Sequence, residues 1–216
     1  MRLVFASNNA HKLAEVREIM PEGVEVLSLK DIGFEAEIEE TGATLEENSV
    51  IKAEAVYQWL VDEGISGFAV NGVFADDTGL EIDALDGKPG VYTARWYRLN
   101  GLADEGISGL VDEREIFAAN RAKALRELEG KANRGAQFRT VITLIKANGE
   151  RLTVSGIVRG RIAEEEYGEG GFGYDPVFIP EGYDKTFGEL PAEVKNGISH
   201  RARALQALLP LVNGKW

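Results

Sequence analysis

The chain of 216 residues has no cysteine, only two histidines and no long apolar run. Without cysteine there are no disulfides, no thiolate catalysis and no cysteine-ligated metals. The two histidines, His11 and His200, argue against a histidine-rich zinc site. No stretch approaches the ~20 apolar residues of a membrane-spanning helix, and the apolar part of the amino terminus is too short for a signal peptide. We therefore expect a cytoplasmic protein without a membrane partner.

Positive charge is also scarce, because 24 basic residues face 36 acidic ones and the net charge is −12. Nucleic-acid binding needs a cationic surface, so we expect no nucleic-acid partner, and an RNA-binding module is the least favoured function. A small anion can still bind where a few basic groups converge. The length suits one large domain or two small lobes.

Strand-like and helix-like segments interleave along the chain, which indicates an α/β or α+β class with a mixed sheet. Apolar alternation predicts strands at 2–6, 24–29, 68–75, 81–85, 138–146 and 151–162, and periodicity predicts helices at 10–20, 44–62, 113–128 and 199–212. Thr44 and Glu47 have the spacing of a capping box. Residues 87–90 read as a turn, and the glycine-rich stretch 99–111 shows no clear pattern. The absence of repeats and linkers favours one compact fold.

Two adjacent carboxylates, Asp76 and Asp77, follow the apolar stretch 68–75. Like charges repel, and burial raises the cost of ionising either group. One aspartate after a strand is a common turn or cap, but a pair at a buried strand end is costly without a cation. The sequence therefore predicts a metal site here. The acidic stretch Glu39-Glu40 offers a further carboxylate, or is only a solvated charge run.

Two basic stretches in the amino-terminal half could hold an anion. Residues 7–12, SNNAHK, lie at a strand-to-helix junction, where free backbone N–H groups and Lys12 favour phosphate. An ordinary helix cap with a surface lysine explains the same residues. Lys52 lies on the helix predicted after Thr44, and is either solvated or directed at the same anion.

Two stretches near the carboxyl terminus also have alternative readings. GGFGYDP, residues 170–176, combines glycines with aromatic rings that could stack on a base; in the alternative, the rings fill the core. Lys195, His200 and Arg201 surround a helix start predicted at Ser199. Cations there oppose the helix dipole, which indicates an anionic or hydrogen-bonding partner.

Five stretches, in order, resemble the inosine triphosphate pyrophosphatase family, also called the Ham1-like or XTP/dITP diphosphatases: SNNAHK, EETGATLEENSVIKA, ADDTGLEIDALDGKPGVYTAR, GFGYDPVFIP and KNGISHRARAL. The resemblance implies a single domain over 1–216 with a long, twisted mixed sheet flanked by helices. It also implies two lobes with an active-site cleft, and a homodimer. The implied reaction is Mg²⁺-dependent hydrolysis of non-canonical purine nucleoside triphosphates, ITP, dITP and XTP, to monophosphate and pyrophosphate, which cleanses the nucleotide pool.

The resemblance also implies functions for individual residues. Substrate contacts fall on Ser7, Asn8, Asn9, Ala10, His11, Lys12, Lys52, Thr78, Phe172, Gly173, Tyr174, Asp175, Lys195, His200 and Arg201, with Phe172 to Asp175 in the base pocket. Glu39 and Asp77 would bind the metal, although the adjacent Glu40 is an equal candidate. Asp77 would also accept a proton from water, and Arg201 or a backbone N–H would favour the six-oxo group of the purine.

Three features limit the resemblance. Thr78 and Gly197 differ from the commonest family pattern, and residues 96–115 align poorly. The alternatives are a Maf-type nucleotide pyrophosphatase with another base preference and a non-catalytic nucleotide-binding protein.

Overall fold

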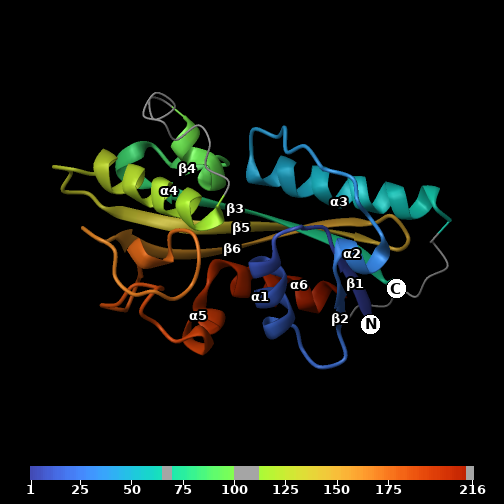
Figure 1. Ribbon diagram of the computed structural model, residues 1–216. Helices are drawn as coiled ribbons and strands as arrows, with labels where there is room; N and C mark the ends of the chain where they lie inside the picture. The colour runs from blue at the N-terminus through green and yellow to red at the C-terminus, as the bar shows by residue number, and fades with distance from the viewer. Residues whose placement is uncertain (65–69, 100–111, 213–216) are drawn as a thin grey trace. The chain divides into compact units, whose positions relative to one another are not determined.

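The computed structural model describes residues 1–64, 70–99 and 112–212 (Figure 1). Its α-helices are α1 (Ala10–Ile19), α2 (Leu29–Ile32), α3 (Leu45–Asp62), α4 (Glu113–Glu127), α5 (Ala192–Ile198) and α6 (His200–Val212). Its strands are β1 (Arg2–Phe5), β2 (Glu25–Leu27), β3 (Gly72–Ile82), β4 (Lys88–Gly90), β5 (Gly135–Lys146), β6 (Arg151–Ile162) and β7 (Phe178–Pro180). Three short 3-10 helices are η2 (Asp83–Leu85), η3 (Thr93–Arg98) and η5 (Asp175–Val177). Most of the poorly aligned stretch 96–115 lies outside the described residues.

The strands form one sheet in the order β2-β1-β3-β5-β6-β7, and β4 also pairs with β3. Strand β1 runs parallel to β2 and β3, whereas the β3–β4 and β6–β7 pairs are antiparallel. The sheet is therefore mixed and carries helices, which confirms the predicted α/β class with a mixed central sheet.

The chain divides into two compact units. Unit 1 comprises Met1–Asp77, Thr140–Ile157 and Ile198–Trp216, and unit 2 comprises Thr78–Arg139 and Val158–Gly197. Strands β3, β5 and β6 contribute a segment to each unit.

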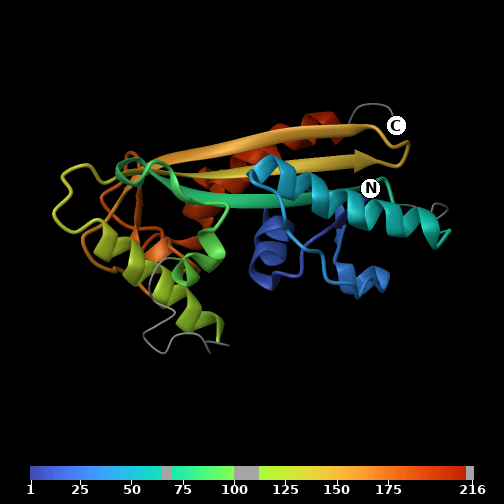
Figure 2. The same cartoon turned by 90° about the horizontal axis from the view of Figure 1, so that it is seen from above.

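Side-chain alternation along β1 and β3 builds two separate cores in unit 1. Phe5 and Phe74 belong to the core that α1 and α6 cover, and their rings stack with centroids 4.9 Å apart. Val4 and Val73 belong to the core on the other face, which α3 covers. Figure 2 shows α3, in cyan, beside β3, in green. Odd and even positions of β3 in unit 1 therefore face different helices.

Several predicted boundaries are wrong, and the largest error concerns β3. The segments 68–75 and 81–85 were predicted as separate strands, but β3 runs unbroken from Gly72 to Ile82, and residues 83–85 form η2. Residues 68 and 69 lie outside the described part. The Asp-Asp-Thr-Gly sequence resembles a turn, yet its charged side chains find partners within the fold, so the strand continues through it.

Smaller errors occur elsewhere. The predicted strand 24–29 ends at Leu27, because Ser28 and Asp31 form a capping box that starts α2. The predicted turn at 87–90 contains β4, and α5 was not predicted. In the part of the chain that the structure describes, no helix is both long enough and apolar enough to cross a membrane.

Candidate functional site

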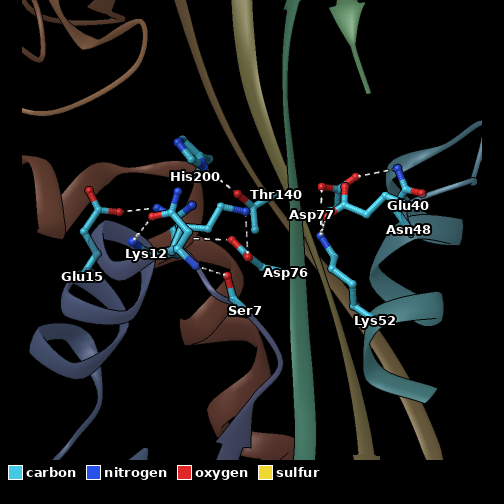
Figure 3. A network of polar contacts seen from close by, with 12 residues as sticks. Ser7, Lys12, Glu15, Glu40, Asn48, Lys52, Asp76, Asp77, Thr140 and His200 are labelled. Atoms are coloured by element: carbon cyan, nitrogen blue, oxygen red, sulfur yellow. Dashed lines mark hydrogen bonds and ion pairs between the residues drawn. The ribbon is translucent and has the colours of Figure 1, made fainter. Parts of the chain in front are cut away.

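The two adjacent aspartates of β3 point to opposite faces of the sheet (Figure 3). Asp76 shares its face with Phe74, under α1 and α6. Asp77 shares its face with Val73 and Ala75, under α3. The two carboxylates that the sequence predicts around one cation therefore lie on different faces, because neighbouring side chains of a strand alternate. Each aspartate has its own set of partners.

Asp76 is neutralised by two cations of the protein. Its Oδ1 accepts a hydrogen bond from Lys12 Nζ at 2.9 Å, and its Oδ2 accepts one from Arg201 Nε at 3.0 Å. The Arg201 guanidinium also donates to Glu15. Burial alone would raise the pKa of Asp76, but the charges of Lys12 and Arg201 outweigh it and hold this pKa well below its usual range. Asp76 is an ionised, buried anchor.

The start of α1 places Lys12. Asn9 is the N-cap, and its Oδ1 accepts a hydrogen bond from Lys12 N at 2.9 Å. Ser7 Oγ accepts one from Asn9 N at 3.2 Å. Residues 7–12 therefore form an ordinary cap, as in the alternative reading, but Lys12 is directed at Asp76 rather than left on the surface. Burial lowers the pKa of Lys12, against the opposing effect of Asp76.

The start of α6 places Arg201 and His200. Ser199 Oγ accepts a hydrogen bond from Ala202 N at 3.2 Å, which confirms the predicted N-cap. His200 Nδ1 lies 2.5 Å from Thr140 Oγ1 on β5. Both His200 and Arg201 are buried, so the first turn of α6 faces the protein interior.

Asp77 has a different environment on the α3 face. It is 7% exposed, and Lys52 Nζ donates to its Oδ1 at 3.2 Å. The same ammonium donates to Glu40 Oε1 at 3.0 Å, and Asn48 Nδ2 donates to Asp77 Oδ2 at 3.1 Å. Burial raises the pKa of Asp77, and the charge of Lys52 only partly opposes this shift. Asp77 thus has one ammonium that it shares with a second carboxylate.

The sequence around α3 explains this arrangement. Thr44 and Glu47 make the predicted capping box, so α3 begins at Leu45. Asn48 and Lys52 are four residues apart and share one helix face. Gly42 N donates to Asn48 Oδ1 at 2.8 Å, and a Cβ on Gly42 would lie 2.6 Å from that oxygen. The approach of the loop to Asn48 therefore requires glycine.

The residues near Asp77 fit a hard cation in part. Asp77 and Glu40 both contact the Lys52 ammonium, whereas Glu39 is exposed. Across residues 1–64, 70–99 and 112–212, no three His, Cys, Asp or Glu side chains form a metal-binding group. Magnesium does not need such a group, because it often takes one or two carboxylates and completes its shell with water and phosphate oxygens. The geometry favours Glu40 over Glu39 as the second carboxylate.

The predicted base-pocket stretch lies in unit 2 and is tied down by Asp175. The Oδ2 of Asp175 accepts hydrogen bonds from Phe172 N at 2.7 Å and from Lys195 Nζ at 2.8 Å. The Lys195 ammonium also lies 4.8 Å from the centroid of the Phe172 ring. Tyr174 is buried and donates from its hydroxyl to Thr93 O at 3.1 Å, and burial raises its pKa. Tyr174 thus fits the core-filling reading, while Phe172 is half-buried.

The predicted site residues form two groups, one in each unit. Unit 1 holds Ser7, Asn8, Asn9, Ala10, His11, Lys12, Glu39, Lys52, Asp77, His200 and Arg201; unit 2 holds Thr78, Phe172, Gly173, Tyr174, Asp175 and Lys195. Asn8, Ala10 and His11 are exposed. The Nε and Nη1 atoms of Arg201 are engaged by Asp76 and Glu15, so the structure gives this residue a second function beside the predicted one.

Sequence reasoning assigned no function to Glu15 or Asn48. Asn48 could have been found, because it precedes Lys52 by one helical turn. Glu15 follows Lys12 on the same helix, but its partner Arg201 is 186 residues away. No local pattern reveals that contact.

Comparisons with known proteins give a consistent result. The Ham1 family is matched over residues 3–211. A dITP/XTP pyrophosphatase of Bacillus subtilis is 46% identical, over 97% of this chain and 96% of that protein. One of Flavobacterium johnsoniae is 45% identical, over 98% of both chains. The solved Ham1 protein of Staphylococcus aureus is 36% identical, covers 99% of both chains and gives a TM-score of 0.79.

Proposed function

Because the chain belongs to the Ham1 family, we propose that it hydrolyses non-canonical purine nucleoside triphosphates, dITP, XTP and ITP, to the monophosphate and pyrophosphate. The observation that carries this proposal is the environment of Asp77: a buried carboxylate of raised pKa, oriented by Asn48 and Lys52. Relatives named dITP/XTP pyrophosphatase that match over nearly the whole chain support it.

Asp77 is proposed to accept a proton from the attacking water. A general base works best when its pKa lies near the working pH, and burial shifts the pKa of Asp77 in that direction. Asn48 and Lys52 bond to different oxygens of its carboxylate and so fix the plane of the group. Positioned general bases contribute roughly 10² to 10⁴ in rate.

The cations of unit 1 are proposed to bind the polyphosphate. A protein of net charge −12 repels a nucleoside triphosphate at long range, so binding needs local positive charge. Lys12 and Lys52 provide it, one on each face of β3. Arg201 fixes Asp76, and Asp76 in turn orients Lys12. Hydrogen bonds from the N-terminal turn of α1 would add to the site.

Magnesium is the proposed cofactor, held by Asp77 and by Glu40 or the adjacent Glu39. When bound, it would stabilise the negative charge that develops on the pyrophosphate leaving group. A chelator should abolish pyrophosphate release, and added Mg²⁺ should restore it. Hydrolysis that continues at full rate in excess EDTA would remove the metal from the proposal.

Unit 2 is proposed to bind the base. Phe172 offers a half-buried aromatic ring, and Lys195 and Asp175 hold its position. Thr78 and His200 remain proposed substrate contacts. Discrimination against ATP would come from hydrogen-bond donors to the six-oxo group, because such sites reject analogues that lack the matching group.

A pyrophosphate-release assay over dITP, XTP, ITP, GTP, ATP and the pyrimidine triphosphates tests the function. The expected result is strong preference for the first three. Preference for pyrimidine nucleotides would favour the Maf-type alternative. Tight dITP binding without pyrophosphate release would indicate a nucleotide-binding protein without catalysis.

We further propose that residues 1–216 work as one bilobed domain in a cytoplasmic homodimer. The support is the resemblance to the family together with the match over almost the full chain. Light scattering of the purified protein checks the dimer, for which a mass twice the 23.6 kDa of the chain is expected.

A further inference from the structure

The glycine-rich stretch 170–176 needs support from outside itself. Gly171 and Gly173 have φ values of +73° and +62°, a left-handed conformation that glycine adopts without strain. Such glycines also raise the conformational entropy that the loop loses when it is ordered. Because the proposed function assigns the base to Phe172 and its neighbours, contacts that order this loop should affect nucleotide binding.

Helix α4 supplies one of these contacts through Arg121. The Nη1 of Arg121 donates a hydrogen bond to Gly173 O at 2.9 Å. Its Nε lies 3.0 Å from Glu166 Oε1, an ion pair without the geometry of a hydrogen bond. The Arg121 side chain is 14% exposed, so water competes little for the bond to Gly173. The guanidinium therefore links α4 to the peptide between Gly173 and Tyr174.

Phe117 contacts the same loop from one turn earlier on α4. Its ring lies 6.2 Å, centroid to centroid, from the ring of Phe172 at an interplanar angle of 45°. Phe117 and Arg121 are four residues apart and thus share a helix face. The two side chains of α4 thus contact neighbouring positions of the loop: Phe117 contacts the ring of Phe172, and Arg121 binds the carbonyl of Gly173.

The helix itself is fixed from another side. Asn120 exchanges hydrogen bonds with η3, to Ala94 O at 3.0 Å and from Tyr97 N at 2.8 Å. Lys123 donates to Trp96 O at 2.9 Å, and its ammonium is buried. With α4 anchored in this way, Arg121 extends from a rigid support rather than from a free surface helix.

We propose that Arg121 is a positioning residue for nucleotide binding, which acts through Gly173 to hold the Phe172–Asp175 loop in the shape that receives the base. It touches the loop and not the reacting groups, so its effect falls on affinity and base selection rather than on the chemical step. This inference rests on the proposed function of the loop, and it adds a residue that none of the sequence motifs includes.

The test compares Arg121→Ala with two matched variants. Arg121→Lys keeps the positive charge and a hydrogen-bond donor, and Arg126→Ala removes an exposed arginine from the same helix. For Arg121→Ala, the KM for dITP is expected to rise about tenfold with kcat changed less than twofold, since a lost charge-assisted hydrogen bond is worth about that factor. Arg121→Lys should recover most of the loss, and Arg126→Ala should match the wild type.

Inorganic tripolyphosphate separates positioning from general damage. This probe carries the polyphosphate but no base, so its inhibition constant should not change in Arg121→Ala if only the base loop is affected. An equal loss for dITP and tripolyphosphate would overturn the proposal, because it would show a global defect. An unchanged KM for dITP, or a fall in kcat alone, would overturn it too.

Failure of the proposed function shows itself separately. If the wild-type protein releases no pyrophosphate from dITP, XTP or ITP, the catalytic proposal fails whatever the variants do. Calorimetric titration with dITP then still measures the effect of Arg121 on binding, as the difference between the dissociation constants of the wild type and Arg121→Ala. Equal constants, or no binding by the wild type, would overturn the inference.

Discussion

The two faces of β3 give its adjacent aspartates, Asp76 and Asp77, opposite pKa shifts. On the α1 and α6 face, Asp76 is 1% exposed and bonded to two cations, Lys12 and Arg201, which lower its pKa. On the α3 face, Asp77 shares one ammonium with Glu40, and burial raises its pKa. A shift of one residue along the strand therefore moves the carboxylate from a face where two cations lower its pKa to a face where burial raises it.

The difference shows how a strand can hold two adjacent buried carboxylates: they point to opposite faces, and each has its own cationic partners. Asp76 stabilises the site by holding Lys12 and Arg201 in place. Asp77 remains able to take a proton, because its compensation is incomplete. The motif thus combines a charge-compensated carboxylate, Asp76, with the carboxylate that we propose as the proton acceptor, Asp77, and variants of each residue separate the two functions.

Loss of the reactive group should have the largest effect. Asp77→Asn is expected to lower kcat for dITP about a thousandfold, within the range for loss of a general base. Stability should change by less than about 1 kcal/mol, because Lys52 keeps its ion pair with Glu40. Pyrophosphate release and urea unfolding measure the two quantities. Near-normal turnover would remove Asp77 from the chemistry.

Loss of the anchor should instead act on stability. Asp76→Asn removes the carboxylate that pairs with both Lys12 and Arg201, and breaking a buried ion pair typically costs about 3 kcal/mol or more. Glu15 keeps its contact with Arg201, so the loss should stay near the lower end. The free energy of unfolding in urea tests this. If Asp76→Asn lowers the free energy of unfolding no more than Asp77→Asn does, the two faces do not differ in stability as expected.

The two adjacent glutamates give a smaller test on the α3 face. Glu40→Gln is expected to raise the Mg²⁺ concentration for half-maximal activity about tenfold, a typical cost for a perturbed metal site. Glu39→Gln should leave this Mg²⁺ concentration nearly unchanged. Glu39 is exposed, whereas Glu40 forms an ion pair with Lys52, which also pairs with Asp77. The reverse order in a Mg²⁺ titration would assign the metal to Glu39.

The pH dependence of stability should show the smallest effect. Below the usual Asp pKa of 3.8, the unfolded chain binds a proton that folded Asp76 does not, so stability falls as pH falls. Asp77 acts in the opposite sense and above pH 3.8. Its raised pKa lets the folded state keep a proton that the unfolded chain has lost, so stability falls as pH rises from 3.8 through the folded pKa of Asp77. Each slope is limited to about 1.4 kcal/mol per pH unit.

Urea unfolding of metal-free protein between pH 2.5 and 7 measures both slopes. Asp76→Asn should flatten the acid side of the profile, and Asp77→Asn should leave that side intact. If Asp76→Asn shows the same acid loss as the wild type, the ionised state of Asp76 does not contribute to stability.

Local patterns predicted the parts of the fold that local physics decides. The capping box of Thr44 and Glu47 placed the start of α3 correctly, and Ser199 did so for α6. The continuous strand β3 was missed because Asp-Asp-Thr-Gly has the composition of a turn. Its partners, Arg201 among them, come from up to 125 residues away in the sequence, and only tertiary contacts reveal them.

The same limit applies to the candidate site. The motifs predict Asp77, Lys12 and Lys52 as site residues by resemblance, yet the choice between Glu39 and Glu40 depends on a loop whose backbone the sequence does not determine. Arg121 lies outside every motif, and its function depends on a contact with Gly173 across 52 residues.

A carboxyl ¹³C NMR titration of Asp76 and Asp77 tests the contrast most directly. In metal-free protein with labelled aspartate, each signal being assigned by its Asn variant, Asp77 is expected to protonate first as pH falls, above the usual value of 3.8. Asp76 should remain ionised well below that value. Coincident titration of the two groups, or protonation of Asp76 first, would contradict the division between anchor and reactive group.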